Sequence, residues 1–95
     1  IIAMSCWQVM LVDGVDVHFV GYNVTEGEGR VSSAIVDFDQ VNMTGRSISG
    51  RIYELLYSPA TNVDATYVWN QWLKLNKVTN WINITHEYEI QKQSA

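Results

Sequence analysis

The chain is short of cysteine, proline, charge and long apolar runs, and each shortage excludes a class of protein. Its 95 residues include one cysteine, Cys6, so an internal disulfide cannot form. Small domains in oxidising compartments usually carry several disulfides, and the sequence therefore predicts a reducing, cytoplasmic location. With one proline, and with 47% hydrophobic against 17% charged residues, the composition is that of a globular domain and not of a disordered chain.

No apolar stretch approaches the roughly 18 to 20 residues that a membrane-spanning helix requires. A charged-then-apolar leader is also missing, so we expect no membrane contact and no export. Met4 followed by Ser5 is typical of a translation start, and residues 1–3 are then expected to come from an expression vector. A chain of this length builds one core, and we expect one domain over residues 4–95.

Positive charge is scarce, with six Lys and Arg residues against ten Asp and Glu, which gives a net charge of -4. Phosphate backbones are bound through clustered Lys and Arg, so nucleic acid is a disfavoured partner. An acidic inhibitor that mimics nucleic acid is one alternative, and it would need the acids to form a continuous exposed stripe. Acids are concentrated in the first two thirds of the chain, among them Asp13, Asp16, Glu26, Glu28, Asp37 and Asp39.

A turn signal between two apolar runs predicts a hairpin near the start of the chain. Residues 6–12 are mostly apolar, and Val15, Val17 and Phe19 alternate with polar residues in the run over 15–23. Between the two runs, Asp13-Gly14 supplies the two positive-φ positions of a type I′ turn. We therefore expect these two strands to pair antiparallel.

Two further strands are expected over residues 30–38 and 47–57, separated by a loop from Asp39 to Gly45. The first carries apolar side chains on both faces, which is typical of a strand covered by a curled sheet or by a partner chain. Gly50, in the middle of the second, indicates a bulge or a sharp bend.

The best-supported element is a helix that follows Ser58-Pro59-Ala60. Thr61 with Asp64 three residues later predicts a variant capping box, with the Thr61 hydroxyl accepting a hydrogen bond from a backbone N–H at the helix start. Lys74 and Lys77 suit the negative pole of the helix dipole. Apolar residues recur at the three- and four-residue spacings of one helical face: Ala65, Val68, Trp69, Trp72, Leu73 and Leu75.

Residues 81–90 alternate with period two and predict a half-buried last strand. Its expected inner face carries Ile82, Ile84, Tyr88 and Ile90. Together the elements predict an α+β fold in which a curled antiparallel sheet of about five strands, in the order β-β-β-β-α-β, carries one amphipathic helix. A half-open, barrel-like sheet or a dimer would each explain strands that are apolar on both sides.

Residue types that carry chemistry are few, and we expect no catalytic residue, cofactor or metal. His18 and His86 are the alternative acid/base candidates, but neighbouring carboxylates in a strand point to the opposite face. Cys6 has no local group to activate a thiolate and is expected to be unreactive. The pair Asp37 and Asp39 shares one strand face, where solvated carboxylates are far commoner than cation sites.

Aromatic residues are the main candidates for a binding surface. A stacking platform for single-stranded nucleic acid comes with a basic groove, which this chain lacks. Aromatics are enriched in cores and in buried interface centres, so we expect core and subunit interface as their main roles, with a ligand pocket as the alternative. The candidate ligand or interface residues are Trp69, Trp72, Tyr53, Tyr57, Trp7 and Tyr22.

In size, composition and general style the whole chain resembles small orphan proteins carried by phages and by integron gene cassettes. The resemblance includes no motif and assigns no residue; it implies a compact α+β homo-oligomer and an accessory binding role. The favoured function is a non-enzymatic binding or assembly module, with a dimer expected, that engages a protein partner or a small apolar ligand. The first alternative is a small enzyme with a His/carboxylate site in a pocket beside the helix.

Overall fold

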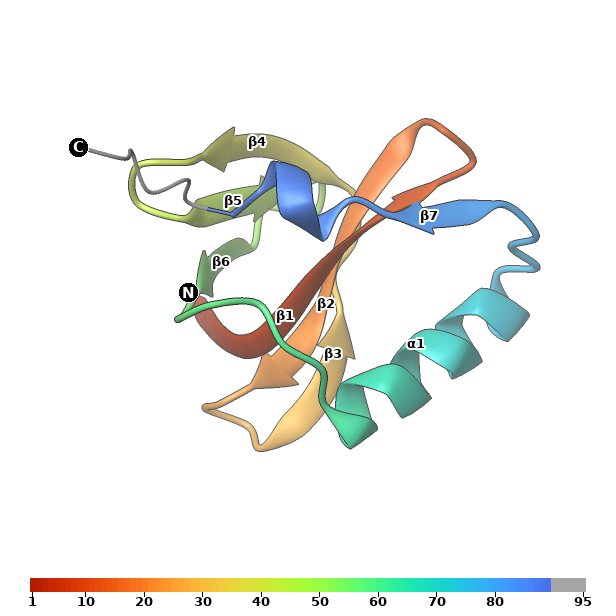
Figure 1. The fold of residues 1–95 in the computed structure, drawn as a ribbon, viewed down its shortest axis with the longest axis horizontal. Coiled ribbons are helices and arrows are strands. Elements are labelled where there is room, and N and C mark those ends of the chain that lie inside the picture. Colours follow the sequence, from red (N-terminus) through yellow and green to blue (C-terminus); the bar gives the residue numbers. More distant parts are fainter. Residues whose placement is uncertain (90–95) are drawn as a thin grey trace.

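In the computed structural model, which describes residues 1–89, seven strands form one mixed sheet and one α-helix packs against it (Figure 1). A short 3-10 helix follows the last strand. The elements are β1 (Ile2–Val12), β2 (Asp16–Asn23), β3 (Glu28–Val31), β4 (Ile35–Asp39), β5 (Thr44–Ser47), β6 (Ile52–Leu55), α1 (Val63–Leu75), β7 (Trp81–Asn83) and η1 (Thr85–Glu87).

The strands run in the order β3-β2-β1-β6-β5-β4, and β7 pairs with the far end of β1. All pairings are antiparallel except β1 with β6, where Ile2 lies opposite Tyr53 and Met4 opposite Leu55. The α+β class with one packed helix is confirmed, whereas the expectation of an all-antiparallel sheet is wrong at this one pairing. The sheet is curled but not closed into a barrel. Whatever the origin of residues 1–3, Ile2 and Ala3 belong to the sheet.

The predicted hairpin is confirmed. Asp13 and Gly14 have φ values of 53° and 67°, and the N–H of Val15 donates to the carbonyl of Val12 at 3.0 Å. Both central residues thus take the left-handed conformation that a type I′ turn requires. Val12 then lies opposite Asp16 across the pair.

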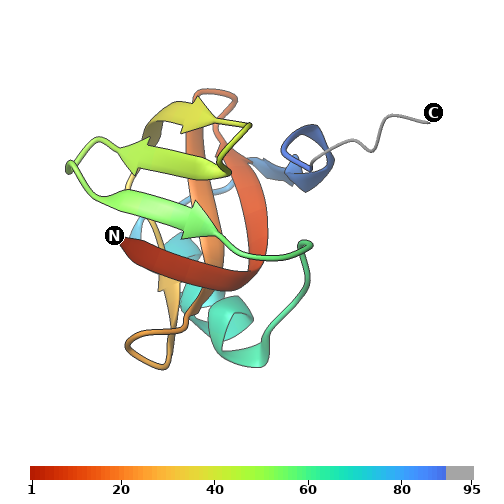
Figure 2. The same ribbon diagram turned by 90° about the vertical axis from the view of Figure 1, so that its left-hand side faces the viewer.

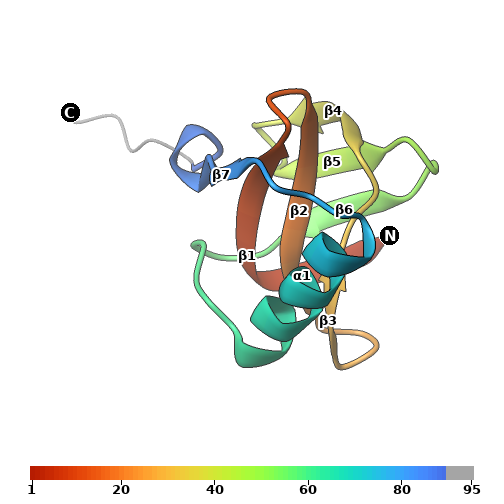
Figure 3. The ribbon, with the colours of Figure 1, turned by 90° about the vertical axis from the view of Figure 1, so that its right-hand side faces the viewer.

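The β1–β2 hairpin is buried on both faces, which explains its apolar residues at successive positions. Val9 and Phe19 belong to one core cluster, while their neighbours Met10 and Val20 belong to a second one. Successive side chains in a strand point to opposite faces, so each strand contributes to both clusters. The first cluster lies beneath the β4–β6 strands, which cross in front of the hairpin in Figure 2. Helix α1 crosses the other face in Figure 3, and it contributes Ala65 and Trp69 to the second cluster.

A bulge at Cys6 lets Met4 and Trp7 share the first cluster although their spacing of three does not fit a regular strand. Cys6 has φ 47°, and the β1–β2 register shifts between Ser5 and Gln8. An extra residue at a bulge moves all later side chains to the other face. The bulge therefore sets which residues of β1 meet the helix.

The prediction of one strand over residues 30–38 is wrong. The chain turns a corner at Ser32, and the segment is divided between β3 and β4. The N–H of Ser32 donates to the Phe19 carbonyl, and the Ser32 hydroxyl accepts from the Phe19 N–H, both at 2.8 Å. Val31 packs in the second cluster, whereas Ile35 packs in the first. The apolar groups on both faces thus reflect a change of layer within the chain.

The single strand expected over residues 47–57 is also divided, between the end of β5 and β6. Thr44 and Gly45, which were expected in a loop, belong to β5. Gly50, with φ 89°, sits in the turn that joins β5 to β6, so the predicted bend is present but interrupts the strand. Gly45 is required for packing as well, because a Cβ there would lie 2.5 Å from the ring of Phe19.

Helix α1 is confirmed, with Asp64 in its first turn and Lys74 in its last. Its N-cap is Asn62 and not Thr61, because the Asn62 side chain accepts from the Ala65 N–H at 3.0 Å. Leu75 is 80% exposed, so its expected place on the buried face is wrong. At 100° per residue Leu75 is rotated well away from the buried pair Ala65 and Trp69.

The last strand covers only residues 81–83 of the expected 81–90. Ile84 is buried and its N–H donates to the Val9 carbonyl, after which the chain enters η1. Ile82 is 55% exposed, so the predicted inner face is wrong there. Ile90, expected on the same face, lies outside the described residues.

The position of the helix cap gives a direct test. We expect Asn62→Ala to lower the free energy of unfolding by about 1 kcal/mol, because the Ala65 N–H loses its acceptor. Thr61→Ala, one residue earlier, is the matched control and should change it by less than about 0.5 kcal/mol. Urea denaturation of both variants makes the comparison, and a larger loss in Thr61→Ala would contradict the cap assignment.

Candidate functional site

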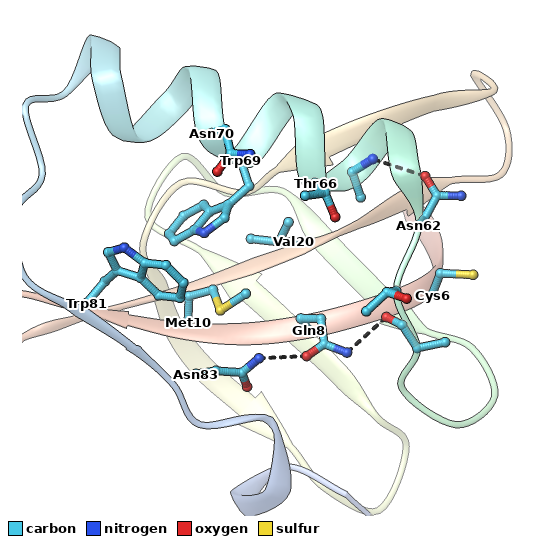
Figure 4. A pocket seen from close by; sticks show the side chains of 13 residues that line it. Cys6, Gln8, Met10, Val20, Asn62, Thr66, Trp69, Asn70, Trp81 and Asn83 are labelled. Atoms are coloured by element: carbon cyan, nitrogen blue, oxygen red, sulfur yellow. Dashed lines mark hydrogen bonds between the residues drawn. The ribbon is translucent and has the colours of Figure 1, made fainter.

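A cavity of about 220 Å³ lies between α1 and the strands β1 and β7, and we call it the helix–sheet pocket (Figure 4). It adjoins the second core cluster, where the helix covers the hairpin. Its lining residues are Cys6, Gln8, Met10, Val20, Ala60, Thr61, Asn62, Ala65, Thr66, Trp69, Asn70, Trp81 and Asn83.

The periodicity of each element brings these side chains to the pocket. On β1 the lining residues Cys6, Gln8 and Met10 follow the two-residue repeat of one strand face. On α1 the lining residues occupy positions 65, 66, 69 and 70, which is one side of a helix. Trp81 and Asn83 again alternate on β7. The pocket therefore forms where three regular faces meet without filling the space between them.

Two tryptophans form the aromatic wall. Trp69 and Trp81 meet edge to face, with ring centroids 5.4 Å apart and an interplanar angle of 89°. Trp69 also stacks on Trp72, with centroids 5.3 Å apart and an angle of 12°. Trp72 in turn contacts the ring of His18 at 4.6 Å. Trp81 is 39% exposed, so the wall reaches from the core to the surface.

The indole nitrogen of Trp69 is the one buried side-chain nitrogen or oxygen without a hydrogen-bond partner among residues 1–89. The residue is only 4% exposed, and in Figure 4 its nitrogen lies on the ring edge that faces the strand side of the pocket. Leaving a buried donor unpaired costs about 1 to 3 kcal/mol, and such groups are rare in native proteins.

Three side-chain amides of the lining are held in place by backbone groups or by one another. Gln8 donates from Nε2 to the Ala60 carbonyl at 2.9 Å and accepts at Oε1 from Asn83 Nδ2 at 2.7 Å. Asn83 Oδ1 accepts from the Thr85 N–H at 2.9 Å, and Asn62 Oδ1 caps the helix. These three amides are therefore ordered before any ligand binds.

The lining contains no Asp, Glu, Lys, Arg or His. A cavity of this composition cannot move a proton between a carboxylate and an imidazole. It can enclose a neutral molecule, with the apolar side chains around its body and the amides around its polar groups.

The aromatic residues singled out from the sequence are separated by the fold. Trp69 lines the helix–sheet pocket, and Trp72 stacks on Trp69 without lining the pocket itself. Trp7 and Tyr57 line a different cavity of about 370 Å³, which is bordered by Glu89, the last described residue. The indole N–H of Trp7 is already satisfied there by the carbonyls of Leu56 and Tyr57, at 3.2 and 3.1 Å.

Tyr53 and Tyr22 lie away from the helix–sheet pocket. Tyr53 is buried in the first cluster, where its hydroxyl accepts from Nε of Arg30 at 3.0 Å and the guanidinium lies over its ring. Tyr22 is half-buried on β2, with its hydroxyl beside Gly27.

The two histidines do not meet, and neither lines the pocket. His18 is buried, with Nδ1 2.8 Å from the Ser32 carbonyl oxygen. His86 is exposed on η1, 4.0 Å from the carboxylate of Glu87. Neither is placed with a carboxylate in a cavity.

Asp37 and Asp39 are engaged in local contacts. Asp37 pairs with Arg46 on the neighbouring strand. Asp39 accepts from the side chain and backbone of Asn42 and from the backbone of Val41, and these hydrogen bonds, led by the Asn42 side chain, lower the pKa of its carboxyl. Within residues 1–89, no three His, Cys, Asp or Glu side chains gather as a metal site would require.

Sequence reasoning missed Gln8, Asn62 and Asn83, the amides that shape the pocket. They are distant in the chain, and an isolated amide carries no spacing signal. The one indication was the period-two placement of Gln8 beside Met10 and of Asn83 beside Trp81.

Comparisons with protein-family models, curated proteins and solved structures gave no match to this chain. No helix in residues 1–89 has the length and apolarity needed to cross a membrane. The chemistry of the pocket is therefore interpreted from its own residues.

The Gln8 contacts predict a charge-sensitive variant. Gln8→Glu places a carboxylate against the Ala60 carbonyl, and we expect a loss of about 1 kcal/mol in the free energy of unfolding at neutral pH. Because this carboxylate would have a raised pKa in the folded state, the loss should be present above the unfolded pKa of about 4.3 and shrink at lower pH. Gln71→Glu on the exposed face of α1 is the control, and a pH-independent deficit in Gln8→Glu would contradict the assignment.

Proposed function

We propose that the protein is a non-enzymatic binding module that holds a small uncharged ligand in the helix–sheet pocket. The observation that carries the proposal is a cavity of about 220 Å³ whose lining combines apolar and aromatic side chains with amides and contains no charged side chain. The amides of Gln8 and Asn83, already held by other groups, lose little freedom on binding.

The enzyme alternative has less support. An acid/base site beside the helix would bring a histidine and a carboxylate into one cavity, whereas the helix–sheet pocket is lined by neither. The acidic-inhibitor alternative is also weakened. Asp13 and Asp16 lie at one end of β2, and Glu26 and Glu28 lie beyond its other end, so the acids do not run side by side.

Self-association is proposed as a second property of the module. Val63, Tyr67 and Leu75 are exposed apolar side chains of α1, at 85%, 65% and 80% exposure. Large exposed apolar groups on one element can belong to an interface. A dimer through these residues would leave the opposite face of the helix free to line the pocket. The cytoplasmic location and the relation to mobile-element orphan proteins stay predictions.

Filling the pocket should abolish binding without unfolding the protein. Thr66 is exposed on α1 and lines the pocket, so Thr66→Phe should project a ring into it, whereas Val41→Phe adds the same ring in the exposed β4–β5 turn. Screening a library of neutral fragments by two-dimensional NMR of the four indole N–H groups should give hits that shift Trp69 and Trp81.

We expect those shifts to vanish in Thr66→Phe and to persist in Val41→Phe. Hits that shift only the indole of Trp7, or that are unaffected by Thr66→Phe, would argue against the pocket as the binding site.

For self-association, we expect the double variant Tyr67→Arg with Leu75→Glu to weaken the dimer at least 10-fold, measured by sedimentation at several concentrations. Val41→Arg changes an equally exposed apolar residue in the β4–β5 turn and is the matched control. A wild-type protein that stays monomeric at every concentration, or a control variant that dissociates equally, would end this part of the proposal.

A further inference from the structure

We infer that the helix–sheet pocket binds a neutral sugar ring, either as a free monosaccharide or as the end of a glycan. This inference rests on the proposed function and names the chemical class of its ligand. Its basis is the arrangement of the lining, which has an apolar floor, an exposed tryptophan at one end and uncharged polar groups on opposite sides of the floor.

The floor of the pocket is apolar and buried. Met10, Val20 and Ala65 line it at 7%, 3% and 3% exposure. Trp81 stands at one end of this floor in Figure 4 and is 39% exposed, so its ring offers surface to a ligand. A sugar ring carries C–H groups on its two faces, and these pack against apolar and aromatic side chains as other apolar groups do. The floor and Trp81 therefore suit the faces of such a ring.

Polar side chains lie on opposite sides of the floor (Figure 4). Thr66 and Asn70 come from α1 on one side, and Gln8 and Asn83 come from β1 and β7 on the other. Thr61 adds a hydroxyl from the segment that leads into the helix. A ligand that fills the pocket therefore meets polar groups on more than one of its edges.

Both donors and acceptors are unused among these groups. The side chains of Thr61, Thr66 and Asn70 are exposed, and none of them is hydrogen-bonded to another group of residues 1–89. A threonine hydroxyl can donate or accept, and an asparagine amide does both. Gln8 Nε2 and Asn83 Nδ2 each make one hydrogen bond and have one further hydrogen. The rim is thus mixed in polarity and suits a ligand that both donates and accepts.

This arrangement selects among ligand classes. A hydroxyl group both donates and accepts, so several hydroxyls around one ring can match a mixed rim on both of its sides. A ligand with a single polar group meets one side and excludes water from the polar groups of the other. A charged ligand would lose its hydration in a lining without any charged side chain to compensate. A neutral ring with several hydroxyls meets all of these conditions.

The size of the cavity limits the bound part of the ligand to about one ring. A volume of 220 Å³ corresponds to about seven water molecules at roughly 30 Å³ each, which is room for one six-membered ring with its hydroxyls. A free monosaccharide and the last residue of a glycan present the same ring. In a glycan the next ring would lie outside the pocket.

The test uses probes of similar ring size that differ in charge and in the number of hydroxyls. The neutral sugars are the methyl glycosides of glucose, galactose and mannose, and the controls are protonated glucosamine, glucuronate and cyclohexylmethanol. Affinities are measured by two-dimensional NMR of the indole and side-chain amide N–H groups of the intact protein. At least one methyl glycoside should bind about 10-fold or more tightly than every control. It should shift Trp81, Gln8 and Asn83 and leave the indole of Trp7 in place.

Two variants connect this preference to the lining. Trp81→Ala removes the exposed ring and should weaken the preferred glycoside at least about 10-fold, whereas Ile82→Ala, at the next exposed position of β7 and outside the lining, should leave its affinity unchanged. Thr66→Val keeps the shape of the side chain without its hydroxyl and should weaken the glycoside about 2- to 10-fold. Thr79→Val, outside the lining, is its control. Thr66→Val keeps the test decisive if Trp81→Ala does not fold.

A disaccharide that ends in the preferred sugar distinguishes the two sources of the ring. If it binds at least as tightly as the methyl glycoside, the ligand is the end of a glycan. If it binds more weakly, the ligand is the free monosaccharide.

The outcomes separate this inference from the proposed function. If no methyl glycoside shifts Trp81, while the neutral-fragment screen still gives hits that Thr66→Phe abolishes, the sugar class is wrong and the binding function stands. If any control probe binds as tightly as the best methyl glycoside, the sugar class is overturned in the same way. If the screen gives no hits that depend on Thr66, the proposed function fails together with the inference.

Discussion

The burial of the β1–β2 hairpin on both faces is the constraint on which the rest of the structure depends. A hairpin whose successive residues Val9 and Met10, or Phe19 and Val20, are all apolar must be covered on two sides. The chain achieves this by turning at Ser32 and sending β4–β6 across one face, and then returning through α1 to cover the other. The curled, open sheet is the shape that follows.

The pocket is a consequence of how the helix covers its face. Gly29 lets the start of α1 approach β3 closely, since a Cβ there would lie 2.4 Å from the Asp64 carbonyl oxygen. On the β1 side, Trp69 and Trp81 meet edge to face and line the cavity that remains between the helix and the sheet. The amides of Gln8 and Asn83 then keep the space polar at one edge. The same packing that completes the second cluster therefore leaves a cavity without charged side chains.

Much of the local structure was predictable, because it depends on neighbours in the chain. The Asp13-Gly14 turn and the period of α1 are short-range signals, and both are confirmed. The predictions that were wrong have a common cause, because they depended on contacts between segments that are distant in the chain. Ser32 ends a strand because its hydroxyl and N–H bind Phe19, and Leu75 is exposed because nothing packs on that side of the helix.

The candidate site was predictable only in its aromatic part. Trp69 was singled out because aromatic side chains are large and costly to expose, a property that a sequence displays directly. The role of Gln8 depends on Ala60 and Asn83, which lie more than 50 residues away along the chain and are brought within 3 Å by the fold. Hydrogen-bonding partners at such separations leave no trace in local spacing.

The sequence by itself determined that the chain forms one α+β domain with a hairpin and an amphipathic helix, since apolar period and turn chemistry act over a few residues. Only the tertiary structure decided the bulge at Cys6, the corner at Ser32, the parallel pairing of β1 with β6 and the open cavity under α1. Each of these depends on which distant segments pack against each face of the hairpin. The orientation of the amides and the unpaired N–H of Trp69 follow from that packing and not from any motif.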